Sequence, residues 1–232
     1  MKIGLLSDIH GNLPALQVCL HKLNEKKTDL IICLGDTVGY GPFPNECLDT
    51  LRQRQIPSVL GNHDAAAIGK LTLNIFREPN ASLLKWTAKN LRGENQAYLL
   101  KLPLTIENEN WIAAHASPVN PERWQYLRSA ITCRSILKKI DQDICFVGHT
   151  HIPGVVANEI GIFNLKKGYK YVINPGSVGQ SRDEDYRASC GIFDTDLFSY
   201  QNYRVEYDIK DTLKGYDRIG ISKADARYLL HL

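Results

Sequence analysis

The N-terminal part of the chain alternates between short apolar runs and helix-like segments. The runs are KIGLLSD, DLIICLGD and IPSVLGN, at residues 2–8, 29–36 and 56–62. Between them, residues 12–27 carry apolar side chains at helical spacing, and residues 44–55 form a second predicted helix. Strands that alternate with helices predict parallel βαβ units and an α/β fold.

The second half is richer in strands. LTIENENWIAAHAS predicts a hairpin around residues 108–110, and DICFVGHT predicts a further buried strand. Residues 80–102 read as helix with a break near Gly93, residues 154–177 and 188–208 as strands, and the C-terminal segment as mostly helical. We expect one domain, residues 1–232, with two packed sheets and helices outside.

Composition narrows the classes of partner. A net charge of +3, with basic residues in isolated pairs, does not indicate a nucleic-acid or membrane partner. The six cysteines are widely spaced without a C-x-x-C motif, and no apolar stretch reaches the roughly 18 residues of a membrane span. The N-terminus lacks a signal-peptide pattern, so a cytoplasmic location is predicted.

A short polar motif follows each of five apolar runs. The motifs SDIHGN, GDTVGYGP, GNHD, HASP and GHTHIP begin at residues 7, 35, 61, 115 and 148. They contain five of the seven histidines, whereas His21 and His231 lie in helix-like segments. Because ligands of open α/β sheets bind beyond the carboxyl ends of the strands, we expect these motifs to meet at one site.

Strand periodicity suggests how the donors are grouped. Side chains two residues apart on a strand point to the same side, so Asp8 with His10, and His149 with His151, are each expected to hold one metal ion. The full predicted ligand set is Asp8, His10, Asp36, Asn62, His115, His149 and His151.

This donor set predicts the kind of metal centre. Imidazole, carboxylate and amide donors favour Mn, Fe, Ni or Zn over calcium, and manganese is our first choice. Seven donors exceed the needs of one tetrahedral zinc ion. They match two divalent ions bridged by a shared carboxylate, an arrangement that serves phosphoryl hydrolysis. Taken alone, each motif also fits a turn, a loop or a helix cap, and the metal hypothesis depends on all five together.

The chain resembles the calcineurin-like metallophosphoesterase superfamily, whose motifs run D-x-H, G-D, G-N-H-[DE], H and G-H-x-H. All five are intact here between residues 8 and 151. The resemblance implies a four-layer αββα sandwich, with two mixed β-sheets flanked by helices. It assigns Asp8, His10 and His151 to a first ion, assigns Asn62, His115 and His149 to a second, and makes Asp36 the bridge. His63 would be the catalytic histidine, oriented by Asp64.

The implied reaction is hydrolysis of a phosphodiester in a small-molecule or nucleotide substrate, by attack of a metal-bridging hydroxide. The serine/threonine phosphatases of the superfamily carry G-D-x-V-D-R-G, whereas this chain has GDTVGYG and is more similar to small bacterial and archaeal phosphoesterases. The alternatives are a phosphomonoesterase or protein phosphatase of the same superfamily and a non-catalytic scaffold on this fold.

Four further residues are candidate substrate contacts. Tyr40 lies on a glycine-flanked loop and fits either stacking on a substrate or surface packing. Ser177 belongs to an NPGS turn that offers backbone N–H groups to an anion. Arg182 fits a phosphate clamp or a salt bridge with residues 183–185, and Asn12 fits a phosphate contact or a helix cap.

Overall fold

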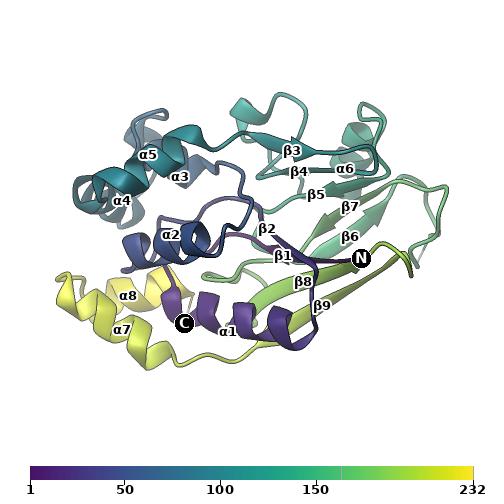
Figure 1. The fold of residues 1–232 in the computed structure, drawn as a ribbon. Helices are drawn as coiled ribbons and strands as arrows, with labels where there is room; N and C mark the ends of the chain where they lie inside the picture. The colour runs from purple at the N-terminus through teal and green to yellow at the C-terminus, as the bar shows by residue number, and fades with distance from the viewer. Residues whose placement is uncertain (163, 232) are drawn as a thin grey trace.

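Two mixed β-sheets form the centre of the molecule (Figure 1). The computed structural model describes residues 1–162 and 164–231. The first sheet has the strand order β2-β1-β8-β9, and the second has the order β3-β4-β5-β7-β6. The strands are β1 (Lys2–Leu6), β2 (Leu30–Cys33), β3 (Thr105–Glu107), β4 (Trp111–Ala114), β5 (Ile144–Phe146), β6 (Gly154–Ala157), β7 (Tyr171–Asn174), β8 (Ala188–Asp194) and β9 (Ser199–Val205). Pairing is parallel for β1–β2, β4–β5 and β5–β7 and antiparallel elsewhere, as expected for mixed sheets.

The main hydrophobic core lies between the two sheets. Alternate residues of each strand face inward, so Ile3 and Leu5 of β1 meet Phe146 of β5 and Ile173 of β7 in one buried cluster. The intervening residues face outward and pack against helices. Burial on both faces explains why these strands read as continuous apolar runs in the sequence.

Helices cover the outer face of each sheet. Helix α1 (Leu13–Glu25) packs against β8, and α2 (Pro44–Gln53) extends the same cluster through Cys47 and Leu51. On the other side, α6 (Ala130–Leu137) packs against β6 and β7. The predicted four-layer αββα sandwich is therefore confirmed.

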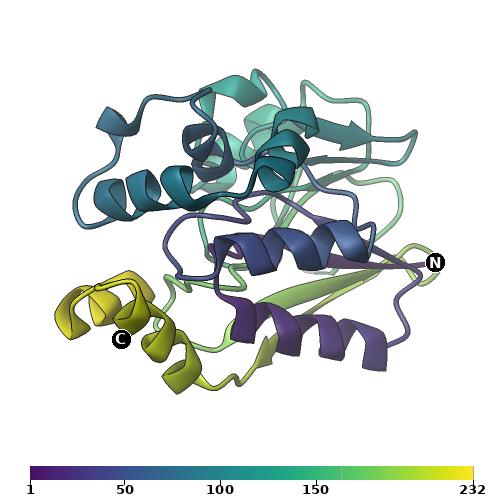
Figure 2. The same ribbon diagram turned by 60° about the vertical axis from the view of Figure 1, so that its left-hand side comes forward.

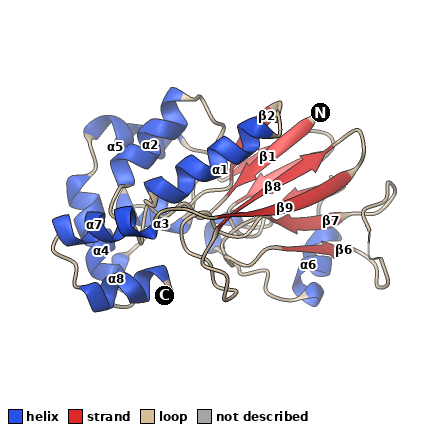
Figure 3. Ribbon diagram, turned by 90° about the horizontal axis from the view of Figure 1, so that it is seen from below, coloured by secondary structure: helices blue, strands red, loops and turns tan. Residues whose placement is uncertain are grey.

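The remaining helices gather beyond the end of the sheets at which β1 finishes (Figures 2 and 3). They are α3 (Asn62–Ala67), α4 (Asn80–Asn90), α5 (Gly93–Lys101), α7 (Ile209–Arg218) and α8 (Lys223–Leu230), with short 3-10 turns at Leu73–Ile75 and Pro121–Arg123. The predicted break near Gly93 is confirmed, since α4 ends at Asn90 and α5 begins at Gly93. The predicted hairpin around residues 108–110 is formed by β3 and β4.

The third predicted strand, residues 56–62, is not formed. A single isolated bridge joins Ser58 to Cys33, and the N–H of Leu60 then donates to the carbonyl of Pro103 at 2.8 Å. The run leaves the sheet after this bridge because β2 itself ends at Cys33 and the chain turns toward α3. In the described part of the chain, no helix is both long and apolar enough to span a lipid bilayer.

Candidate metal centre

The five polar motifs converge at the carboxyl ends of β1, β2, β4 and β5. Short backbone hydrogen bonds join their loops, such as Asp8 N–H to Gly35 O at 3.0 Å and Gly148 N–H to His115 O at 2.9 Å. Five of the predicted ligands adopt a left-handed backbone conformation, with φ between 49° and 65°: Asp8, His10, Asp36, His149 and His151. Non-glycine residues rarely adopt this conformation, and it is concentrated at functional sites.

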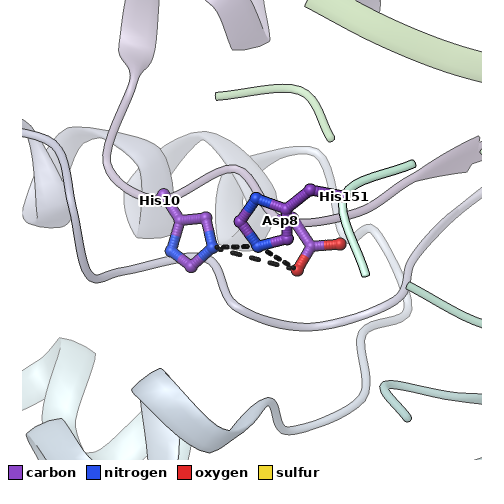
Figure 4. A group of neighbouring side chains, drawn as sticks. All are labelled: Asp8, His10 and His151. Carbon is purple, nitrogen blue, oxygen red and sulfur yellow. Dashed lines mark hydrogen bonds and ion pairs between the residues drawn. The ribbon is translucent and has the colours of Figure 1, made fainter. Parts of the chain in front are cut away.

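The first group of donors consists of Asp8, His10 and His151 (Figure 4). The Nε2 atoms of His10 and His151 lie 3.1 Å apart. Asp8 Oδ1 lies 3.3 Å from Nε2 of His151 and 3.8 Å from Nε2 of His10. All three side chains are buried, and their donor atoms point toward one another.

The second group consists of Asp36, His115 and His149, with Asn62 beside it. Nε2 of His115 lies 3.1 Å from each of three atoms: Asp36 Oδ2, His149 Nδ1 and Asn62 Oδ1. Asp36 Oδ2 also lies 3.8 Å from Nε2 of His10 in the first group. Asp36 therefore faces both groups.

Backbone carbonyls fix the orientation of three imidazoles. Nδ1 of His10, His115 and His151 lies 3.1, 2.8 and 2.6 Å from the carbonyl oxygens of Val38, Leu34 and Gln180 respectively. Because a carbonyl oxygen only accepts, each Nδ1 carries a hydrogen, and each Nε2 faces the group, where it can bind a metal ion once it carries no proton. This backing of a ring nitrogen by a carbonyl is typical of histidines that bind metal.

The carboxylate of Asp8 fits the same interpretation. Its Oδ2 accepts hydrogen bonds from Ser7 Oγ at 2.6 Å and from the N–H of His149 at 3.0 Å, whereas its Oδ1 is buried without a hydrogen-bond partner. An ionised oxygen left unpaired in the interior is costly unless a cation is near. The unpaired oxygen and the converging lone pairs fit a divalent metal ion.

The absence of a side chain at two glycines makes this geometry possible. A Cβ at Gly148 would overlap Ser7 Oγ and lie 2.6 Å from Asp8 Oδ2. A Cβ at Gly61 would overlap Oδ1 of Asp36, which accepts a hydrogen bond from the N–H of His63 at 2.8 Å. Both carboxylates are thus held by backbone N–H groups that only glycine lets approach.

The electrostatics of the cluster favour positive charge. Burial alone would raise the pKa of Asp8, but the imidazoles of His151 and His115 outweigh burial and hold that pKa below its usual range. Burial opposes protonation of His115, yet the carboxylate of Asp36 raises the pKa of this imidazole to about 9. The carboxylates thus attract a cation into the space between the rings.

The expectation that His149 and His151 share one ion is wrong. His151 lies in the first group and His149 in the second. Side-chain alternation applies to extended backbone, whereas these residues have φ values of 65° and 62° and follow the end of β5. The division between groups agrees with the assignment implied by the family resemblance.

His63 lies beside the first group, on the first turn of α3. One of its ring nitrogens lies within 4.8 Å of donor atoms of His10 and Asp36, and its Nδ1 is buried without a partner. Burial lowers the pKa of His63 to about 4. The predicted orientation of His63 by Asp64 is not seen, because the Asp64 carboxylate accepts from the N–H groups of Val38 at 3.0 Å and Gly61 at 3.1 Å.

Tyr40 and Arg182 form one wall beside the first group. The Tyr40 ring lies 4.5 Å from the ring of His10 and 4.8 Å from that of His63, measured between centroids. Arg182 Nη2 donates to Tyr40 Oη at 3.0 Å, and burial raises the pKa of Tyr40 to about 12. The alternative salt bridge of Arg182 is not formed among the described residues, where Asp183 pairs with Arg204 and Asp185 with Arg187.

Asn12 and Ser177 have structural roles. The side-chain amide of Asn12 donates to Gly179 O and Tyr207 Oη, and its oxygen accepts from Thr212 Oγ1 and, as the N-cap of α1, from the N–H of Ala15. Ser177 Oγ donates to the carbonyl of Asp8 and accepts from the N–H of Gln180, both at 2.8 Å. The side-chain polar atoms of both residues are buried and already paired, so Asn12 is a helix cap. The contact of an anion with backbone N–H groups of the NPGS turn stays a prediction.

Tyr126 and Arg128 lie beside the second group, although no sequence motif predicted them. The Tyr126 ring stacks on His149 at 3.8 Å between centroids with an angle of 21° between planes. The guanidinium carbon of Arg128 lies 4.0 Å from the centroid of the same ring. The segment WQYLR has no motif or periodicity that marks it, so its place in the tertiary fold was needed to identify these residues.

Comparison with known proteins gives matches along most of the chain. Residues 1–197 match the calcineurin-like phosphoesterase superfamily domain. An uncharacterized protein of Methanocaldococcus jannaschii is 41% identical over 232 residues, which cover 94% of this chain and 91% of that protein. The crystal structure of a metallophosphoesterase from Sphaerobacter thermophilus is 36% identical, with a TM-score of 0.84 over 99% of this chain and 98% of its own. Phosphodiesterase YfcE of Escherichia coli is 25% identical over 208 residues, or 86% of this chain and 90% of that enzyme.

Proposed function

Because the chain belongs to the calcineurin-like phosphoesterase superfamily, we propose that it is a dinuclear metal-dependent phosphodiesterase acting on a small phosphorylated substrate. This proposal rests on the position of Asp36 between two buried donor groups, with its Oδ2 3.8 Å from Nε2 of His10 and 3.1 Å from Nε2 of His115. Asp8, His10 and His151 would hold one ion, Asn62, His115 and His149 the other, and Asp36 would bridge them. Manganese is proposed because the donors are imidazole, carboxylate and amide.

Two ions bound here would activate a water molecule and neutralise the charge of the phosphate oxygens. The overall reaction consumes one water: its oxygen forms a new bond to phosphorus, the ester P–O bond breaks, and the leaving oxygen ends as a hydroxyl. The buried loops around Asp8 and Asp36 hold the donors in place before substrate arrives, so little reorganisation is needed during the reaction.

His63 is proposed to act on the leaving oxygen. A ring nitrogen of this residue lies near the junction of the two donor groups, where a bound phosphate would sit. A neutral imidazole can donate a hydrogen bond or a proton to the departing oxygen. Gly39 makes room for this ring, because a Cβ at position 39 would lie 2.6 Å from the Nδ1 atoms of both His10 and His63.

Tyr40 and Arg182 are proposed to bind the substrate on the side of the first group. Gly39 and Tyr40 occupy the positions at which G-D-x-V-D-R-G enzymes have aspartate and arginine. A guanidinium is still available, since Arg182 reaches Tyr40 Oη from a different loop. This change supports a substrate other than a phosphoprotein, and the name of the Escherichia coli relative supports a diester.

A cytoplasmic location remains part of the proposal. All six cysteines are buried and free, which fits a reducing compartment. Burial raises the pKa of the Cys33 thiol to about 12, so this thiol stays protonated and unreactive at neutral pH.

The proposal is tested with protein stripped of metal by chelator and reloaded with Mn²⁺. Rates are compared for bis(p-nitrophenyl) phosphate, p-nitrophenyl phosphate, 2′,3′-cyclic AMP and diadenosine tetraphosphate. We expect kcat/KM for the aryl diester to exceed that for the aryl monoester by about tenfold or more, which corresponds to about 1.4 kcal/mol in the transition state. Preference for the monoester would contradict the diesterase proposal. Full metal loading without hydrolysis of any of these four compounds would favour the alternative of a non-catalytic scaffold on this fold.

A further inference from the structure

Three side chains form a continuous stack at the edge of the metal centre. The Tyr126 ring lies nearly parallel to the imidazole of His149, 3.8 Å away, and the Arg128 guanidinium lies 4.0 Å from the same ring centroid. Two groups so close to one centroid cannot share a face of the ring without overlapping. Tyr126 is therefore the middle layer between a predicted metal ligand and a cation.

The stack belongs to a loop that is fixed to the second donor group. The loop begins at His115, passes Trp124, whose ring lies 6.1 Å from that of His115, and is anchored by buried Leu127. Asn120 and Trp124 have φ values of 52° and 51°, so the path of this loop is set by an unusual backbone. The position of Arg128 is thus tied to both His115 and His149.

The guanidinium of Arg128 can bind an anionic ligand. Among residues 1–162 and 164–231, no carboxylate forms an ion pair with its guanidinium. The side chain is exposed, and Tyr126 itself is 38% exposed. Stacking covers the face of a guanidinium but leaves the N–H groups at its edge available, and these match the geometry of a phosphate.

The position of Arg128 indicates what it would bind. Arg182 already stands beside the first donor group, on the side of His10, whereas Arg128 stands beyond His149 of the second group. A phosphodiester bound between the two donor groups has two ester substituents. Arg182 would stand on the side of one substituent and Arg128 on the side of the other. A single phosphodiester does not need the additional charge of Arg128, because two metal ions would already neutralise the charge of the scissile phosphate.

We propose that Arg128, positioned by Tyr126, forms a subsite for a second anionic group of the substrate. The substrate class is then a phosphodiester that carries a further phosphate on the substituent facing His149, as a 5′-phosphorylated dinucleotide does. This inference rests on the proposed function and adds the chemistry of the substituent on the side of His149. Arg128 acts by binding, and Tyr126 is a positioning residue.

The test compares two substrates that differ by one phosphate. The dinucleotide ApA has only the scissile phosphate, and pApA carries a second one at its 5′ end. With Mn²⁺-loaded protein, we expect kcat/KM for pApA to exceed that for ApA, and Arg128→Ala to lower this ratio by about tenfold, mainly through KM. Arg123→Ala is the matched control, since Arg123 is an exposed arginine of the same loop outside the stack; we expect it to leave the ratio unchanged.

Variants of Tyr126 test whether stacking on its ring is what positions Arg128. Tyr126→Phe keeps the ring and is expected to keep the ratio, whereas Tyr126→Ala removes the middle layer and is expected to lower the ratio as Arg128→Ala does. As a readout independent of turnover, calorimetry of inorganic pyrophosphate binding should show about tenfold weaker affinity for Arg128→Ala than for wild type.

Two outcomes would overturn the subsite. One is a ratio of the two kcat/KM values that Arg128→Ala leaves at the wild-type level, and the other is an equal effect of Arg123→Ala. Failure of the proposed function has a different signature, because the wild type would then hydrolyse neither dinucleotide nor bis(p-nitrophenyl) phosphate. Hydrolysis of the aryl diester without discrimination between ApA and pApA would remove this inference alone.

Discussion

The backbone N–H of His149 donates a hydrogen bond to Oδ2 of Asp8 at 3.0 Å. This bond joins the loop after β1 in one sheet to the loop after β5 in the other. It occupies one carboxylate oxygen, so the other oxygen is left for the imidazoles of His10 and His151. The first donor group thus depends on a contact between the sheets, and that contact depends on the missing side chain at Gly148.

Gly148→Ala is expected to damage this arrangement. The added Cβ would overlap Ser7 Oγ and press on the Asp8 carboxylate, and such overpacking typically costs about 1–3 kcal/mol. Urea unfolding and metal analysis of the purified protein measure the effect. Gly154→Ala is the control, because a Cβ there meets no atom within 4 Å. If Gly148→Ala equals the control in stability and metal content, the close approach is not required.

His63→Asn is expected to keep its metal and lose activity. His63 is absent from both predicted ligand sets, so bound metal should stay at the wild-type level. Loss of a group that assists the leaving oxygen should lower kcat by about 10²–10⁴. His21→Asn, on the exposed surface of α1, serves as the control. Wild-type turnover in His63→Asn would remove this residue from the mechanism.

Asp64→Asn is expected to act through stability. The Asp64 carboxylate accepts from the N–H groups of both Val38 and Gly61, and an amide has only one oxygen to replace the two. One buried N–H would lose its partner, which costs about 1–3 kcal/mol. Thermal unfolding should show this loss, and kcat should fall less than in His63→Asn. A loss of kcat equal to that of His63→Asn, at unchanged stability, would instead support a direct action of Asp64 on His63.

Metal removal is expected to lower the melting temperature. An ion that binds only the folded state at about 100 times its Kd adds about 2.7 kcal/mol. For a chain of 232 residues this corresponds to about 5–10 °C. Differential scanning calorimetry of chelated and Mn²⁺-loaded protein gives the shift, and Ca²⁺ should give a smaller one because it prefers oxygen donors. Equal melting temperatures with and without Mn²⁺ would speak against a site at Asp8 and Asp36.

Much of the fold and donor set could be predicted from local pattern. Buried strands such as β1 and β5 are continuous apolar runs because both of their faces are covered, and the polar motifs mark where these runs end. The four layers followed from the resemblance and are confirmed by the two sheets and their covering helices.

The errors came from features that depend on tertiary context. Residues 56–62 have strand composition, but β2 is too short to pair with them beyond Ser58. The pairing of His149 with His151 assumed an extended backbone at positions with positive φ. Asn12 has a suitable side chain for a phosphate contact, yet partners distant in sequence occupy it. Tyr126 and Arg128 gain meaning only when the fold places them over His149.

Anomalous scattering from a crystal of Mn²⁺-loaded protein tests the metal centre most directly. We expect two peaks about 3.5–4 Å apart, with Asp36 between them. Asp8, His10 and His151 should surround one peak, and Asn62, His115 and His149 the other. A single peak, or a fully loaded crystal in which these side chains point away from any peak, would contradict the dinuclear centre.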